Sequence, residues 1–105
     1  MKLSHVAVAV AAVCLVGGVH AQSLEDLLKK NGCTACHAVD KKVIGPAYVE
    51  VANKYKNDPK APAYLADKIK KGGSGVWGQI PMPPNTQASD ADVKKIVDDI
   101  LKLKK

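Results

Sequence analysis

The chain has 105 residues, with 16 Lys, no Arg and 10 acidic residues, and its formal net charge is +6. A chain of this length forms one small domain, and a composition of 47% apolar and 25% charged residues excludes a disordered or collagen-like protein. Phe is absent and aromatic residues make up only 4%, so we expect something other than side chains to fill part of the core.

Residues 1–21 have the pattern of a cleaved secretory signal peptide. Lys2 gives a short positive start, residues 6–16 are an unbroken apolar run, and small residues precede a cleavage point after Ala21. The apolar stretch is shorter than the roughly 18 residues that a membrane span needs, so a retained membrane anchor is the less favoured interpretation. We therefore expect export to the periplasm, with residues 22–105 as a single mature domain.

Few side chains in the mature chain can bind a metal or support redox chemistry. It keeps one histidine (His37), one methionine (Met82), one tryptophan (Trp77) and two cysteines (Cys33 and Cys36). Fifteen lysines against 10 acidic residues leave it a formal charge of +5. Any metal or redox site must be built from this set.

Apolar spacing predicts four helices, and no stretch shows the alternation of a strand. In chain order we expect helices at 23–30, capped by Ser23; at 47–55, with Pro46 at the first helical position; at 62–71, ended by Gly72; and after Ser89, with an apolar stripe along 93–101. The fold class is therefore all-α.

Residues 72–87 contain four glycines and three prolines and have no apolar periodicity. A long loop of this kind in a small domain is usually functional or disordered. It contains Met82, which is flanked by prolines.

Cys33-Thr34-Ala35-Cys36-His37 is a C-x-x-C-H motif, the signature of covalent haem attachment. At this spacing Cys33 and Cys36 can each form a thioether to a haem vinyl group. The next residue, His37, then places its imidazole over the iron.

Three other interpretations of the two cysteines compete with haem. A structural disulfide is common in exported chains, although a loop this short adds little stability. A thioredoxin-like redox pair requires a βαβ setting, which the pattern lacks. A structural zinc site needs four ligands, and only a carboxylate such as Asp40 could complete the set.

Met82 favours haem over these alternatives. Iron bound by His on one side can take Met on the other, which raises the reduction potential. Met is also a common core residue, but a core Met usually lies in a helical stripe, whereas Pro81 and Pro83 stiffen the backbone around this one. We expect Met82 to be the second axial ligand.

Three segments together resemble the small bacterial class I cytochromes c of the cytochrome c-551 type. They are residues 33–37, residues 43–48 (Val-Ile-Gly-Pro-Ala-Tyr) and residues 75–85 (Gly-Val-Trp-Gly-Gln-Ile-Pro-Met-Pro-Pro-Asn). The resemblance implies the class I cytochrome c fold, with about four short helices around one covalently attached haem c. The chain departs from the family pattern at two positions: relatives commonly have Trp where this chain has Asp99, and Phe near Leu28.

Further roles follow from the resemblance alone. The carbonyl of Pro46 would accept a hydrogen bond from His37, and Asn85 would donate toward the Met82 sulfur. Trp77 and Lys68 would contact a haem propionate.

With both axial positions occupied, the iron would have no open site for a substrate. The expected function is a periplasmic one-electron carrier, not an enzyme, that acts between a reductase or dehydrogenase donor and a terminal oxidase or nitrite reductase acceptor. If Met82 were labile, a haem-based sensor of small ligands or a weak peroxidase would be the alternative.

The lysines predict docking on acidic surfaces of redox partners, with Lys41 and Lys42 as candidates for the haem rim. Nucleic-acid binding is excluded because the chain has no Arg and no base-reading motif, and because export separates it from DNA. We expect a monomer without a stable membrane anchor.

Overall fold

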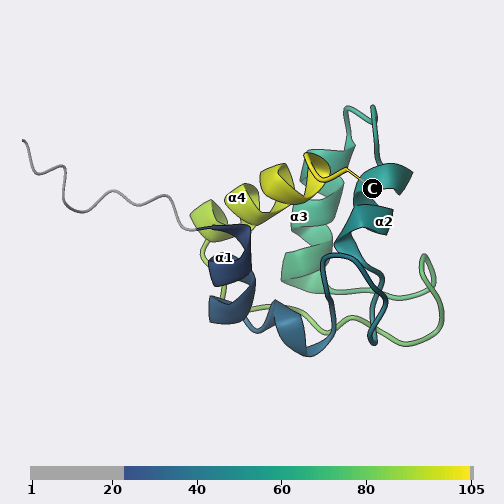
Figure 1. Cartoon of the computed structure of the whole chain (residues 1–105). Helices are drawn as coiled ribbons and strands as arrows, with labels where there is room; N and C mark the ends of the chain where they lie inside the picture. Colours follow the sequence, from purple (N-terminus) through teal and green to yellow (C-terminus); the bar gives the residue numbers. More distant parts are fainter. Residues whose placement is uncertain (1–22, 105) are drawn as a thin grey trace, which may run out of the picture.

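The computed structural model describes residues 23–104; the expected signal peptide, residues 1–21, lies outside this range. Within it the chain forms five helical elements (Figure 1). They are α1 (Leu24–Lys30), the 3-10 helix η1 (Cys33–Ala35), α2 (Tyr48–Lys54), α3 (Ala61–Lys71) and α4 (Asp90–Leu101). Residues 23–104 contain two isolated bridges but no strand, so the all-α prediction is confirmed.

Serine caps begin α1 and α4, as the sequence predicts. The hydroxyl of Ser23 accepts a hydrogen bond from the Asp26 N–H at 3.2 Å. In the same way, the hydroxyl of Ser89 accepts one from the Asp92 N–H at 3.1 Å. Each cap satisfies an N–H group that has no partner inside its helix, and this fixes the start of the helix.

The prediction that Pro46 opens the second helix is wrong. Ala47 is the extended N-cap residue, with φ −61° and ψ 142°, and Tyr48 is the first residue of α2. The first two N–H groups of α2 donate to the carbonyls of Ala38 and Val39, both at 3.0 Å. Because these carbonyls accept bonds from the N–H groups of residues 48 and 49, α2 begins at Tyr48, and Pro46 lies before the helix.

Gly72 ends α3, as predicted, and it also allows the Met82 segment to approach. Its φ of 74° is a conformation that favours glycine. A Cβ atom at this position would overlap the carbonyl oxygen of Met82. The start of α3 differs from the prediction by one residue, because Ala61 precedes Pro62 in the first turn.

The core lies where α4 crosses the other helices (Figure 1). α4 packs against α1, α2 and α3, and its inward stripe is buried. The central cluster is aliphatic apart from one tyrosine, and its members are Leu27, Leu28, Tyr48, Val51, Ile96 and Ile100. Also on α4, the half-buried Asp99 forms an ion pair with Lys95 at 2.7 Å. None of the helices described between residues 23 and 104 has the length and apolar character needed to cross a membrane.

Removal of the α4 cap should destabilise the protein. Because Ser89→Ala leaves the Asp92 N–H without its acceptor, we expect the free energy of unfolding to fall by about 1 kcal/mol. Urea unfolding of the haem-loaded protein measures this change. Ser89→Asn, which can still cap the helix, is the control and should stay near the parent value; equal losses in both variants would contradict the assigned cap.

Candidate cofactor site

A cavity of about 560 Å³ lies between η1, α2, α3, α4 and the loop of residues 72–87. This volume falls within the usual range for cofactor sites. Every site residue predicted from the sequence contributes to its wall: Cys33, Cys36, His37, Pro46, Lys68, Trp77, Met82 and Asn85. The fold therefore gathers side chains from four separate parts of the sequence around one space.

The C-x-x-C-H segment forms a tight helical turn in the cavity wall. The N–H groups of Cys36 and His37 both donate to the carbonyl of Cys33, at 3.2 Å and 3.0 Å. Gly32, with a φ of 74°, turns the chain from the end of α1 into this segment. The turn places two thiols and one imidazole along the same cavity.

Three neighbours hold the His37 ring. Its Nδ1 lies 2.8 Å from the carbonyl oxygen of Pro46 and donates to it in the tautomer that leaves Nε2 unprotonated. The ring stacks on Tyr48, with centroids 4.8 Å apart and planes inclined by 22°. A Cβ atom at Gly45 would overlap the ring. Metal-binding histidines are commonly fixed in this way, by a backbone carbonyl that accepts a bond from the second ring nitrogen.

The loop that contains Met82 is held at its base by two backbone hydrogen bonds. The Gly73 N–H donates to the Met82 carbonyl at 3.0 Å, and the Met82 N–H donates to the Gly73 carbonyl at 2.7 Å. Gly75 N–H donates to the Gly78 carbonyl at 2.8 Å and closes the tip. Although residues 72–87 contain no helix, their backbone is fixed around the half-buried thioether.

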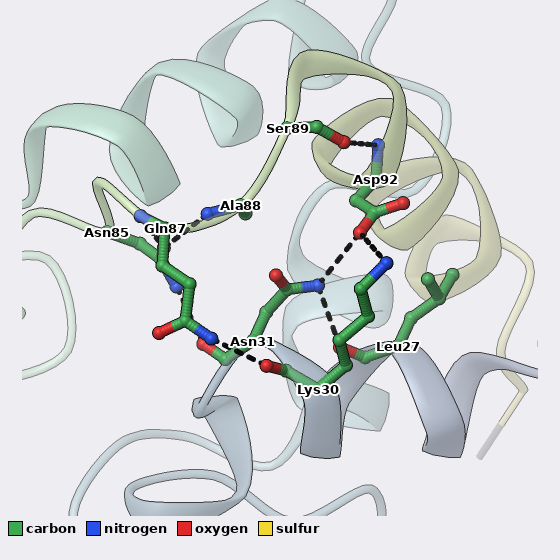
Figure 2. A network of polar contacts seen from close by, with 8 residues as sticks. All are labelled: Leu27, Lys30, Asn31, Asn85, Gln87, Ala88, Ser89 and Asp92. Atoms are coloured by element: carbon green, nitrogen blue, oxygen red, sulfur yellow. Dashed lines mark hydrogen bonds and ion pairs between the residues drawn. The ribbon is translucent and has the colours of Figure 1, made fainter.

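Asn85 connects the segment after Met82 to the end of α1 (Figure 2). Its Nδ2 donates to the carbonyl of Asn31 at 2.8 Å. Its Oδ1 accepts from the N–H groups of Gln87 and Ala88, at 3.0 Å and 2.9 Å. Nδ2 carries a second hydrogen, so donation to the Met82 sulfur stays a prediction that these contacts leave open.

Lys68 and Trp77 line the cavity beside aromatic and cationic neighbours that the sequence did not indicate. The Nζ of Lys68 lies 5.3 Å from the centre of the Tyr64 ring. The Nζ of Lys54 lies 5.8 Å from the centre of the Trp77 ring, and Trp77 is 41% exposed. Both predicted propionate contacts stay predictions, and Lys54 is an additional cation at the same end.

The surroundings of the cysteines disfavour a zinc site and a thioredoxin-like pair. Burial raises the pKa of the Cys33 thiol, while a hydrogen bond with Tyr48 acts in the other direction. Reactive redox cysteines have a lowered pKa, so the raised pKa of Cys33 disfavours a thioredoxin-like pair. Between residues 23 and 104, no three His, Cys, Asp or Glu side chains come together in a way that could hold a metal ion.

The same residues fit a covalently attached haem. Two unpaired thiols, an oriented imidazole and a thioether line one largely apolar cavity. The glycines at 45 and 72 keep the His37 ring and the Met82 backbone free of side-chain overlap. Cysteine, histidine and methionine are the side chains that attach and ligate a c-type haem.

Sequence reasoning missed three residues that shape the site. Gly45 and Tyr48 were named only as part of the segment 43–48, yet both contact the His37 ring. Asn31 was given no role, although it is 3% exposed and lines the cavity. Its position directly before Gly32 and the C-x-x-C-H motif is the one available signal of a role in the site.

Comparison with known families and proteins gives a consistent result. The family model described as cytochrome c matches residues 25–104. Cytochrome c-552 of Nitrosomonas europaea is 54% identical over 104 residues, which cover 99% of this chain and 100% of that protein. Cytochrome c-551 of Pseudomonas aeruginosa is 51% identical over 76 residues, 72% of this chain and 73% of that protein.

Solved structures agree. The crystal structure of wild-type Nitrosomonas europaea cytochrome c552 superposes with a TM-score of 0.74 and 60% identity, covering 76% of this chain and 99% of that one. The class 1 cytochrome MtoD of Sideroxydans lithotrophicus superposes with a TM-score of 0.63 and 33% identity, covering 74% of this chain and 89% of that one. The predicted class I cytochrome c fold is confirmed.

A methyl group at Gly45 should disturb the His37 ring. We expect Gly45→Ala to lower the free energy of unfolding by about 1–3 kcal/mol, because the added atom forces the ring away from the Pro46 carbonyl. Chemical unfolding of the haem-loaded protein measures this loss. Val43→Ala, on the same loop and 47% exposed in the parent, is the control and should change little. An unaffected Gly45→Ala variant would contradict the close approach.

Asp92, on α4, receives two polar groups from the end of α1 (Figure 2). Its Oδ2 lies 3.2 Å from the Lys30 Nζ and 3.3 Å from the Asn31 Nδ2. The Lys30 ammonium and then the Asn31 amide hold the pKa of Asp92 below its ordinary value of 3.8. A lowered folded-state pKa stabilises the fold above the unfolded-state pKa, and this contribution disappears as pH falls through the folded-state pKa.

Asp92→Asn should therefore make the free energy of unfolding depend less on pH under acidic conditions. We expect the variant to be less stable than the parent at neutral pH and to lose less stability between about pH 5 and about pH 2. Denaturant unfolding across this range measures both effects. Asp98→Asn on the same helix, which removes an ion pair with Lys94, is the matched control. If both variants kept the parent's acid slope, the lowered pKa would be refuted.

Proposed function

Because the chain belongs to the cytochrome c family, we propose that it carries single electrons between respiratory redox proteins in the periplasm. It is a small class I monohaem electron-carrier cytochrome with one covalently attached haem c. The haem supplies the Fe(III)/Fe(II) couple. The chain's own residues would hold this group, exclude water from it and present one edge of it to partners.

Cys33 and Cys36 would form the two thioethers, and His37 and Met82 would be the axial ligands. One observation carries this assignment: these four side chains, which come from two segments far apart in sequence, line a single cavity. The Pro46 carbonyl would keep the proton on His37 Nδ1, so that Nε2 faces the metal. The bonds between Gly73 and Met82 would hold the thioether segment in one position.

A coordination sphere filled by the protein favours a carrier over an enzyme. If His37 and Met82 occupy both axial positions, no site remains for oxygen, peroxide or substrate. His37 is the sole histidine of the mature chain and would be bound to the metal, so no second imidazole is present to act as an acid or base. Two fixed ligands also keep the geometry similar in the two oxidation states.

The rim of the cavity offers a surface suited to acidic partners. Lys41 and Lys42 are exposed, and a backbone bridge between Lys42 and His37 keeps them beside the C-x-x-C-H turn. Ile44 and Ile80, 49% and 68% exposed, add apolar area around the same cavity. The electron donor would be a reductase or dehydrogenase, and the acceptor a terminal oxidase or nitrite reductase. The carrier itself would be a monomer without a membrane anchor.

Periplasmic location is supported by the N-terminal pattern. Residues 1–21 combine a positive start, an apolar run and a small residue at position 21 before the expected cleavage point. Covalent attachment through Cys33 and Cys36 would keep the haem from being lost in an open compartment.

Optical spectra of the haem-loaded protein test the ligation. We expect low-spin bands when it is reduced and a weak far-red Met-to-iron band when it is oxidised, with little binding of carbon monoxide at neutral pH. Met82→Ala should abolish the far-red band and admit carbon monoxide. Ile80→Ala, in the same loop, is the control and should keep both parental properties.

A high-spin spectrum of the parent, or ready carbon monoxide binding, would refute the carrier proposal. The result would instead favour a sensor of small ligands or a weak peroxidase.

A further inference from the structure

We propose that Asn31 is a positioning residue for the Met82 thioether. In this assignment, which rests on the proposed His37 and Met82 ligation, Asn31 fixes the end of α1 as the anchor to which the Met82 loop is attached. Neither the C-x-x-C-H motif nor the Met82 loop contains this residue, and the resemblance assigns it no role.

The last carbonyl groups of a helix have no partners inside the helix. At the end of α1 two such groups, those of Lys30 and Asn31, accept hydrogen bonds from side-chain amides of the loop. The Nε2 of Gln87 donates to Lys30 at 2.6 Å, and the Nδ2 of Asn85 donates to Asn31 at 2.8 Å (Figure 2). We call these four residues the α1–loop junction. Through it, the segment directly after Met82-Pro-Pro provides donors to two carbonyls at the end of α1.

The side chain of Asn31 holds this junction in place. It is 3% exposed, and its Nδ2 donates to the Leu27 carbonyl at 2.9 Å and to Asp92 at 3.3 Å. These bonds fix the end of α1 both to its own last turn and to α4. The carbonyl of Asn31, which Asn85 uses, is therefore held by the Asn31 side chain itself.

Asn31 also stands two residues before Cys33 in the sequence. The residue that receives the Met82 loop is thus next to the segment that contributes Cys33, Cys36 and His37. This short connection sets the separation between the two ligand-bearing segments across the cavity that Asn31 itself lines. A shift of Asn31 would move the loop relative to His37, and Met82 would leave the metal more often.

The test compares two variants of the haem-loaded protein that both weaken α1. Asn31→Ala removes the side-chain bonds to Leu27 and Asp92, whereas Ser23→Ala removes the cap at the other end of the same helix. The readouts are the pH at which the oxidised protein loses its far-red Met-to-iron band and the carbon monoxide affinity of the reduced protein. We expect Asn31→Ala to increase the detached fraction of Met82 about threefold to tenfold, the effect of one or two lost hydrogen bonds. Ser23→Ala should leave both readouts at the parent values.

Thermal unfolding of both variants separates positioning from a general loss of stability. If the two variants lose Met82 equally once matched for stability, the positioning role is refuted. If the parent itself lacks the far-red band, the proposed ligation fails, and that result is distinct from an Asn31 variant that behaves like the parent.

Asp92→Ala keeps the proposal testable if Asn31→Ala does not fold. It removes one partner of the Asn31 side chain, the half-buried Asp92 on α4, and leaves the bond to Leu27. At neutral pH it should raise carbon monoxide affinity in the same direction, while Asp98→Ala on the same helix should not. Equal affinities in these two variants would overturn the role of Asn31.

Discussion

The contact between the His37 ring and the Pro46 carbonyl joins the C-x-x-C-H turn to the segment that leads into α2. Pro46 turns its carbonyl toward the ring, and the next residue, Ala47, is extended before α2 begins. The absence of a side chain at Gly45 lets the backbone pass against the ring, and the first turn of α2 then places Tyr48 on the ring face. The orientation of the His37 ring and the start of α2 therefore belong to one local arrangement.

The Met82 segment is organised around a different principle, closure by backbone bonds. Gly72 admits the Met82 carbonyl where any side chain would overlap it, and Gly73 pairs with Met82 in both directions. These contacts hold the loop in place even though it has no regular secondary structure. The prolines limit the backbone locally, and the glycines allow the close contacts that join the loop to the end of α3.

Features governed by nearby residues could be predicted from the sequence. The caps at Ser23 and Ser89 and the buried stripe of α4 depend on spacings of three or four residues, and all appear as expected. The sequence after residue 21 has so few cysteine, histidine and methionine side chains that the candidates could be found by inspection, and all of them line one cavity.

Features governed by distant partners could not be predicted in the same way. α2 begins after Pro46 because its first N–H groups bind Ala38 and Val39, which no local pattern indicates. Asn31 has the sequence signature of a helix end, and its burial depends on Asp92 and on the loop that contains Asn85. The stacking of Tyr48 on His37 likewise arises only when two segments meet.

The hydrogen bonds at the α1–loop junction and the charges of the surface lysines respond differently to salt. Asn85 and Gln87 are neutral donors to neutral carbonyls, so these two bonds neither titrate nor weaken by ionic screening. Attraction of the exposed lysines to a partner falls as salt rises. These two amide bonds beside Met82 are thus unaffected by the salt concentration that would change the rate of encounter with a partner.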